Sequence, residues 1–393
     1  MRNSNFSKAL SAVDWDFRNV SNEGLCGFHW YPATFVSAIP GTIIPILSKP
    51  GDLVLDPFCG TATSGVEALR LGRRFRGIDT NPIAIMIARA RLSIIQPNRL
   101  LSACEELTEA RLKTPKATSH PNEPELLRWY HPETFRELNS ILWWIRSLPS
   151  DYLRIPAQAI FSSILKQASS QSRHWGWVCD NVRPKANEVT YKDAINIYVR
   201  AIESFCNDSE HLFADAQQRI GAISRKELRQ RAHLQCEDAN SAISHMEPGS
   251  VDMVVTSPPY LGVADYVKSQ RLSYLWFSED VLSVEGFGSA SFESLRRREL
   301  GARSYRHAAN SFETYVQYFG AFFVRVREVL KKDGYIAIAI GQSSARANTI
   351  PAMLDAAKAA SLHVMFQTNR AILPTKRRLM AKVPNEDLII FSH

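Results

Sequence analysis

The stretch DLVLDPFCGTATSGVEALRLGRRFRGID, residues 52–79, decides the fold. Its apolar start, 52–55, predicts a short buried strand. A turn containing Gly60 follows, then a helix over 64–71, and 74–79 predicts a second strand that ends at Asp79. The order strand, helix, strand is typical of a parallel, doubly wound α/β sheet, so we expect a Rossmann-like fold.

The rest of the chain divides into three stretches around this unit. Residues 1–96 contain it, and residues 97–232 lose strand-like alternation and show helical spacing at 133–147 and 152–169. Five of the eight tryptophans fall in this middle stretch: Trp129, Trp143, Trp144, Trp175 and Trp177. We therefore predict that 97–232 is a helical insertion or second domain.

Residues 233–393 return to an α/β pattern. Strands are predicted at 250–256, 334–340 and 387–391, with a helix over 312–330. Lys331 and Lys332 followed by Gly334 predict the end of that helix, because basic residues and then glycine favour a helix C-terminus.

Composition excludes several classes of protein. Of the 393 residues, 45% are hydrophobic and 10% aromatic, which excludes global disorder. No apolar run approaches the ~20 residues of a membrane-spanning helix, and the N-terminus lacks an apolar signal region. The six cysteines are scattered without a Cys/His cluster, so we expect an intracellular protein, located in the cytoplasm, with no disulfides and no metal site. A net charge of +8 suits a polyanionic partner but is weak evidence alone.

The turn at 56–64 and Asp79 form the first candidate site. Small residues after a parallel strand let a ligand approach the backbone at the sheet's carboxyl edge. An acidic residue about 20 positions on can accept hydrogen bonds from both ribose hydroxyls of a nucleoside cofactor. A plain tight turn with a strand-end aspartate is the alternative.

The second candidate site is Thr256-Ser257-Pro258-Pro259-Tyr260, directly after a predicted strand. Two consecutive prolines fix φ and remove two backbone donors, which leaves rigid carbonyl acceptors. The serine hydroxyl can accept or donate, and the tyrosine offers a face on which a flat ring can stack. These acceptors and the tyrosine face suit the binding of an aromatic amine. The alternative interpretation is a purely structural proline turn at a sheet edge.

At these residues the chain resembles the amino-group DNA methyltransferases that use S-adenosyl-L-methionine. Residues 56–63 are similar to the family's D-P-F-x-G-S-G-T loop, with Thr61 and Ala62 in place of Ser and the second Gly. Residues 31–35 resemble its H-P-A-x-F segment with Tyr31 in place of His, residues 236–239 its G-D-A segment, and residues 328–336 its E-x-L-K-x-G-G segment. Ser257–Tyr260 matches its catalytic S-P-P-Y. The resemblance covers 28–96 and 233–345, and we expect Ala62 to narrow the space beside the cofactor.

The resemblance implies roles for particular residues. The catalytic ones are Ser257, Pro258, Pro259 and Tyr260. It implies that S-adenosyl-L-methionine is held by residues of the other motifs: Tyr31, Pro32, Phe35, Asp56, Pro57, Phe58, Gly60, Thr61, Thr63, Asp79, Asp238 and Ala239. On this resemblance 1–96 is the cofactor-binding half, 233–393 the catalytic half and 97–232 the candidate target-recognition domain, with 279–311 as the competing candidate.

The S-P-P-Y motif is similar to the catalytic motif of cytosine-N4 enzymes, while adenine-N6 enzymes more often carry D-P-P-Y or N-P-P-Y. The resemblance therefore favours transfer of methyl to N4 of cytosine in double-stranded DNA, with the base flipped out of the duplex. It allows a cognate restriction endonuclease as a functional partner. Candidate phosphate contacts are the basic residues of two clusters and one aromatic segment: Arg296, Arg297, Arg298, Arg303 and Arg306; Lys376, Arg377 and Arg378; and residues 172–177. Each of them could equally be a solvated loop or a packed joint.

Three other classes remain open. An RNA or protein methyltransferase with the same core more often has N-P-P-Y or D-P-P-Y. A binder that lost turnover would not bind the cofactor. A dehydrogenase-like protein is disfavoured because the turn after the first strand lacks G-x-G-x-x-G.

Overall fold

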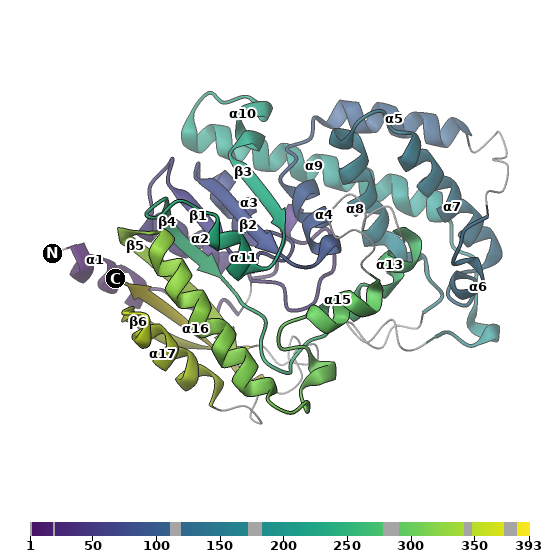
Figure 1. Ribbon diagram of the computed structural model, residues 1–393. Coiled ribbons are helices and arrows are strands. Elements are labelled where there is room, and N and C mark those ends of the chain that lie inside the picture. The colour runs from purple at the N-terminus through teal and green to yellow at the C-terminus, as the bar shows by residue number, and fades with distance from the viewer. Residues whose placement is uncertain are drawn as a thin grey trace.

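A seven-stranded sheet organises the chain, seen in Figure 1 in a computed structural model. The structure describes residues 2–18, 20–110, 119–171, 183–277, 291–341, 348–372 and 383–393. The strand order is β3-β2-β1-β4-β5-β7-β6, and every pair is parallel except those that β7 makes. The strands are β1 (Leu53–Asp56), β2 (Arg74–Asp79), β3 (Ala232–Cys236), β4 (Val251–Thr256), β5 (Leu330–Gly341), β6 (His363–Ala371) and β7 (Asn385–Ser392). The expected doubly wound α/β fold is confirmed.

Helices cover both faces of the sheet. Successive side chains of a strand point to opposite faces, so a strand that is apolar throughout needs a cover on each face. On β5, Ala337 and Ala339 belong to one hydrophobic cluster, while Ile336 and Ile338 belong to the other. The second cluster is closed by α11 (Ala239–Ser244), α16 (Ser311–Val329) and α17 (Thr349–Ala359). The first is closed by α2 (Ala38–Leu47), α3 (Thr63–Arg70) and α4 (Pro82–Arg91).

Helices fill the described parts of the chain between α4 and β3, apart from one short 3-10 turn. They are α5 (Pro97–Ala110), α6 (Glu123–Leu126), α7 (Pro132–Ser147), α8 (Asp151–Ala168), η3 (Ala186–Glu188), α9 (Ala194–Ile220) and α10 (Arg225–Gln230). Figure 1 shows α5, α7, α8 and α9 gathered beside the sheet. Their buried residues, such as Phe161 and Tyr198, lie in the same hydrophobic cluster as Val54 and Phe75 of the sheet. The helical region therefore shares a core with the sheet.

The other helices that the structure describes lie near the N-terminus and after β4. They are α1 (Arg2–Ser11), η1 (Gly24–Cys26), α12 (Tyr266–Ser269), α13 (Arg271–Phe277), α15 (Phe292–Arg298) and η4 (Arg303–Tyr305). No described helix is long and apolar enough to cross a membrane.

The helix end predicted at 330 is confirmed within one residue, but the predicted stop over Lys331–Gly334 is wrong as its cause. Helix α16 ends at Val329, Leu330 is extended, and β5 begins at once. Gly334 does not have a positive φ. A Cβ there would lie 2.9 Å from the Asp252 carbonyl oxygen and 2.7 Å from Leu330, so close packing against β4 requires glycine.

Candidate functional site: a cavity at the carboxyl edge of the sheet

A cavity of about 620 Å³ opens where the parallel strands end. Its walls include the segments after β1 (56–64), β2 (79–81), β3 (236–239) and β4 (257–259). Strand order reverses between β1 and β4, and such a switch point is where open α/β sheets bind ligands. All twelve residues expected to hold a cofactor line this cavity, together with Ser257 and Pro259. Pro258 and Tyr260 are not on its wall.

Asp56, the last residue of β1, ties three elements together. One carboxylate oxygen accepts hydrogen bonds from Thr256 Oγ1 at 2.6 Å and from the Phe58 N–H at 3.2 Å, and the other accepts from the Ser64 hydroxyl. Burial raises its pKa to about 6, although these donors pull the pKa down. Because its oxygens accept three hydrogen bonds from donors on three segments, Asp56 mainly fixes the ends of β1 and β4 and the start of α3.

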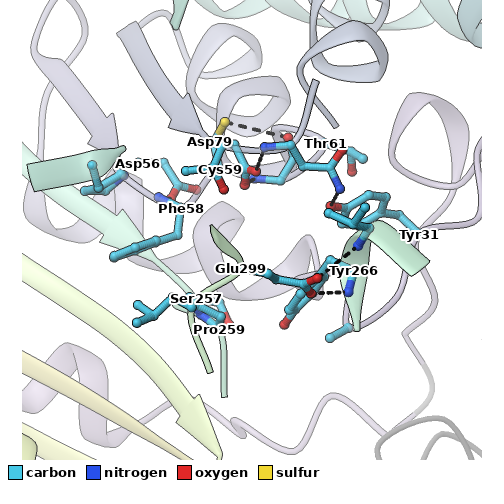
Figure 2. A pocket seen from close by; sticks show the side chains of 18 of the residues that line it. Tyr31, Asp56, Phe58, Cys59, Thr61, Asp79, Ser257, Pro259, Tyr266 and Glu299 are labelled. Carbon is cyan, nitrogen blue, oxygen red and sulfur yellow. Dashed lines mark hydrogen bonds between the residues drawn. The ribbon is translucent and has the colours of Figure 1, made fainter. Parts of the chain in front are cut away.

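Asp79 faces the loop after β1 (Figure 2). Its Oδ2 accepts from the Gly60 N–H at 2.9 Å, and its Oδ1 accepts from the Asn81 N–H at 2.8 Å. Gly60 has φ +50°, a conformation that costs glycine little. Burial raises the pKa of Asp79 to about 6, against the lowering effect of these backbone donors. Each oxygen keeps lone-pair capacity toward the cavity, since a carboxylate has about four acceptor sites.

Ala62 does not narrow the cavity as expected. The residue is fully buried and is not part of the wall, whereas its neighbours Thr61 and Thr63 are. Ala62 precedes α3 with φ +58° and ψ +46°, in the left-handed region. The cost of alanine in place of glycine is therefore backbone strain rather than lost space.

Tyr31 forms the opposite wall with residues that follow β2 and β4. Its ring stacks on Tyr266 at a centroid distance of 6.1 Å, and its hydroxyl oxygen accepts from Asn81 Nδ2 at 3.2 Å. The Asn81 side-chain oxygen accepts from the Tyr274 hydroxyl at 2.8 Å and caps α4 through the Ile83 N–H. This network holds the 31–35 segment against the strand ends.

Asp238 follows β3 and caps α11. One of its oxygens accepts from the Ser241 N–H at 3.1 Å, and the other accepts from the Tyr318 hydroxyl at 2.8 Å. Phe58 supplies a flat wall nearby, backed by Phe319 and Phe322 at centroid distances of 5.8 and 5.3 Å. A carboxylate beside an apolar wall suits a planar heterocycle that bears N–H donors.

The Ser-Pro-Pro-Tyr segment leaves β4 with its ends in different environments. Ser257 and Pro259 lie on the cavity wall (Figure 2), and the Pro259 carbonyl accepts from the Tyr315 hydroxyl at 2.8 Å. Tyr260 is only 4% exposed, and its ring packs against Gly341, where a Cβ would lie 2.8 Å from Tyr260 Cε2. A base could stack on the Tyr260 face only if the residues covering the ring moved.

Glu299 is a cavity residue that the sequence analysis did not single out. It lies just after α15 and accepts hydrogen bonds from the backbone N–H groups of Tyr266 and Val267. Burial raises its pKa to about 8, and the nearby Asp265 and Asp79 carboxylates add to that rise. In the sequence, Glu299 is an acidic residue next to a run of arginines, and that pattern does not predict a binding site. Only the fold brings Glu299 opposite Asp79.

The structure describes only some of the residues that were predicted to contact phosphate. Arg298 lies on the cavity wall, while Arg296 is ion-paired with Glu293 at 3.0 Å and lies over the Phe292 ring. Residues 172–177 and 376–378 lie outside the described residues. The competing recognition segment is 279–311, and the structure describes it from residue 291. Helix α15 of this segment lies beside the cavity.

The chain matches known proteins over parts of its length. Residues 4–90 match the family model N6_N4_Mtase, described as DNA methylase. The chain is similar to the type II methyltransferase M.MvaI of Kocuria varians, with 25% identity over 266 residues, 63% of this chain and 56% of that protein. A 50-residue segment is 56% identical to the type II methyltransferase M2.DpnII of Streptococcus pneumoniae, covering 13% of this chain and 19% of that protein. The chain thus spans about half the length of one relative and a fifth of the other.

Among solved structures, the rRNA methyltransferase aviRa of Streptomyces viridochromogenes, determined at 1.5 Å, aligns with 98% of this chain and 94% of its own. The sequence identity is 11% and the TM-score 0.38, too low to support an argument. The sheet order and the cavity at its carboxyl edge define a Rossmann-like methyltransferase fold. Within that class, residues 4–90 resemble the N4/N6 family of DNA methylases, and parts of the chain are similar to two type II methyltransferases.

Proposed function

We propose that this protein is a DNA methyltransferase that uses S-adenosyl-L-methionine to methylate the exocyclic N4 amine of cytosine in duplex DNA. The observation that carries the proposal is the placement of Ser257 and Pro259 on the same cavity as Asp79, Asp238 and the 56–64 loop. That cavity offers acceptors for a nucleoside at one end and acceptors for an amine at the other. Both relatives are named type II methyltransferases, which supports a DNA substrate.

The cavity fits the proposed cofactor by volume and by donor set. About 620 Å³ lies within the range of small-ligand sites. Asp79 has acceptor capacity for two hydroxyls, Asp238 lies by the Phe58 wall for an aminopurine, and Thr61 and Thr63 line the cavity beside the loop. When bound, S-adenosyl-L-methionine supplies a methyl group made electrophilic by its positive sulfur.

The residues after β4 are proposed to prepare the amine. The nitrogen lone pair of an aromatic amine is delocalised into its ring, and hydrogen bonds accepted from its N–H groups localise that lone pair. Ser257, on the cavity wall, supplies one of these acceptors. The Pro258 carbonyl is proposed as the second, which requires this rigid segment to turn toward the cavity, because Pro258 does not line it. The amine nitrogen gains the methyl and releases one proton, and orientation of the two reactants provides much of the rate.

A base within a duplex does not reach such a cavity, so we propose that the target base flips out. Arg298 on the cavity wall is proposed to contact the DNA backbone. We assign sequence recognition to the helical region 97–232. A restriction endonuclease that cuts the same site would be its functional counterpart.

The test is mass spectrometry of nucleosides from duplex DNA incubated with the protein and methyl-labelled S-adenosyl-L-methionine. We expect label on N4-methylcytosine. Label on N6-methyladenine would keep the cofactor and overturn the choice of base. No label in DNA, with label appearing in RNA or protein incubated in parallel, would overturn the proposed substrate.

A further inference from the structure

A row of buried side chains leads from Ser257 away from the cavity. Ser257 Oγ lies 3.3 Å from the Tyr260 hydroxyl oxygen, and that hydroxyl donates to Glu386 Oε1 at 2.9 Å. The other oxygen of Glu386 accepts from the Arg370 guanidinium. Tyr260, Glu386 and Arg370 are 4%, 8% and 5% exposed, so water does not compete for these bonds. Neither Glu386 nor Arg370 has a part in the function proposed above.

The β6–β7 pair and the N-terminal segment hold this row in place. Arg370 and Glu386 are directly opposite each other in the antiparallel register. Arg370 Nε donates to the Trp15 carbonyl at 3.0 Å, and the N–H of Ala371 donates to the Asp16 carboxylate at 2.9 Å. Arg370 is therefore fixed from two sides, and it fixes Glu386 in turn.

The chemistry of these groups sets the direction of the hydrogen bonds. An ion-paired carboxylate only accepts, and a tyrosine has one hydroxyl proton. Because Tyr260 gives its proton to Glu386, its oxygen can only accept from Ser257. The Ser257 proton then points toward Tyr260, which leaves the serine lone pairs for the cavity that Ser257 lines.

We propose that Glu386 is a positioning residue that sets this direction, so that Ser257 presents an acceptor and selects a substrate base carrying an amino group. The proposal rests on the proposed function and specifies how its site distinguishes substrates. A base with a carbonyl oxygen at the reacting position has an acceptor there. This oxygen would face the lone pairs of Ser257, which are also acceptors, so no hydrogen bond could form. The site would therefore reject deaminated bases such as uracil or hypoxanthine.

The Glu386→Gln variant should reverse the row. Arg370 presents only donors, so the new amide oxygen faces Arg370 and the amide N–H₂ faces Tyr260. Tyr260 then donates to Ser257, and Ser257 donates into the cavity. Tyr260→Phe cuts the row without touching the Glu386–Arg370 pair, which serves the test if Glu386→Gln folds poorly.

Two quantities are measured after the methylated base has been identified. One is the single-turnover rate of methyl transfer. The other is the ratio of affinities for duplexes carrying the amino base or its deaminated analogue, uracil for cytosine or hypoxanthine for adenine. We expect Glu386→Gln to lower the rate and to reduce the ratio roughly three- to tenfold, the worth of one hydrogen bond, with cofactor affinity unchanged.

The matched control is Glu67→Gln, which breaks the Arg70–Glu67 ion pair in α3. It should lower the melting temperature without altering the ratio. In a Tyr260→Phe background, Glu386→Gln should change neither quantity further, because the link to Ser257 is already cut.

Three results would overturn the proposal. They are an unchanged ratio in both Glu386→Gln and Tyr260→Phe, equal effects of Glu386→Gln and Glu67→Gln, or a full effect of Glu386→Gln in the Tyr260→Phe background. If the wild-type protein transfers no methyl to DNA, the proposed function fails and this inference fails with it. If the wild type is active and the variants match it, the inference alone fails.

Discussion

Asp79 illustrates how burial and hydrogen bonding act on one side chain. Two backbone N–H groups bind its carboxylate, yet burial dominates and raises its pKa to about 6. The folded protein therefore holds this proton more tightly than the unfolded chain. The contribution of Asp79 to stability is full below about pH 4 and declines as pH rises toward 6, while its capacity to accept hydrogen bonds grows over the same window.

Cofactor binding should follow that titration. We expect the affinity for S-adenosyl-L-methionine to fall by up to about tenfold per pH unit below pH 6 and to be level above pH 7. Asp79→Asn should reduce affinity at pH 8 by about ten- to a hundredfold, because charge-assisted hydrogen bonds to the ribose are lost. Titration calorimetry from pH 5 to pH 8 measures both, and an affinity that stays level down to pH 5 would contradict the ribose role of Asp79.

Site residues that belong to local sequence motifs could be predicted from the sequence. Site residues that reach the cavity only through tertiary contacts could not. Asp56, Asp79 and Ser257 follow strands directly, so the carboxyl edge of a parallel sheet gathers them. Tyr266 and Glu299 reach the same cavity through a segment whose described residues contain no strand to anchor it. Tyr260 was expected to offer a stacking face, but its place depends on Gly341 and Glu386, more than 80 residues away in sequence.

At the scale of the element, the start of α3 carries strain in its backbone. Ala62 adopts φ +58° immediately before the helix, where a non-glycine residue costs roughly 1–2 kcal/mol. The strain is tolerated because the 56–64 loop is held on both sides of Gly60. The Cys59 N–H donates to the Ile78 carbonyl at 2.9 Å, and Arg91 donates to the Thr61 carbonyl at 2.9 Å.

Ala62→Gly should leave the free energy of unfolding within about 0.5 kcal/mol of wild type. Relief of strain offsets the lost methyl group and the added freedom of the unfolded chain. Ala68→Gly, the same change at a buried position inside α3, should destabilise by about 1–2 kcal/mol because no strain is relieved. Urea denaturation compares the two, and equal losses would show that the Ala62 backbone is not strained.

Strands with a clear apolar run were predictable, and two others were not. β1, β4, β5 and β7 have such runs, whereas β3, Ala-His-Leu-Gln-Cys, has none. β6 forms the sheet edge and is largely exposed or half-buried, so it lacks the apolar pattern of a central strand. The helices of α7 and α8 matched their predicted spans within two residues, because their apolar faces pack on neighbouring helices.

At the scale of the molecule, the net charge of +8 suggests that DNA affinity depends on salt. Each phosphate that the protein neutralises should add about 0.9 to the slope of log affinity against log salt. Replacing Arg298 with Ala should reduce that slope by about one unit if it meets a phosphate. Lys358→Ala, an exposed cation on α17, should leave it unchanged. Fluorescence anisotropy with a duplex at four salt concentrations is the measurement, and equal slopes for both variants would remove Arg298 from the interface.

The sequence predicts a division of the chain into three stretches, but it does not predict how these stretches pack together. Composition shifts mark where helices replace strands. They do not show that Phe161 and Tyr198 pack into one cluster with Val54 and Phe75, because that contact depends on the spatial placement of α8 and α9.

The cavity wall is assembled from segments as distant as Tyr31 and Leu300. Any molecule that fills it bridges parts of the chain that are distant in sequence, so occupancy should protect all of them from proteases at once. A ligand at a hundred times its dissociation constant adds about 2.7 kcal/mol to the cost of global opening. The lifetime of this protein in a cell should therefore rise and fall with the supply of the ligand it binds.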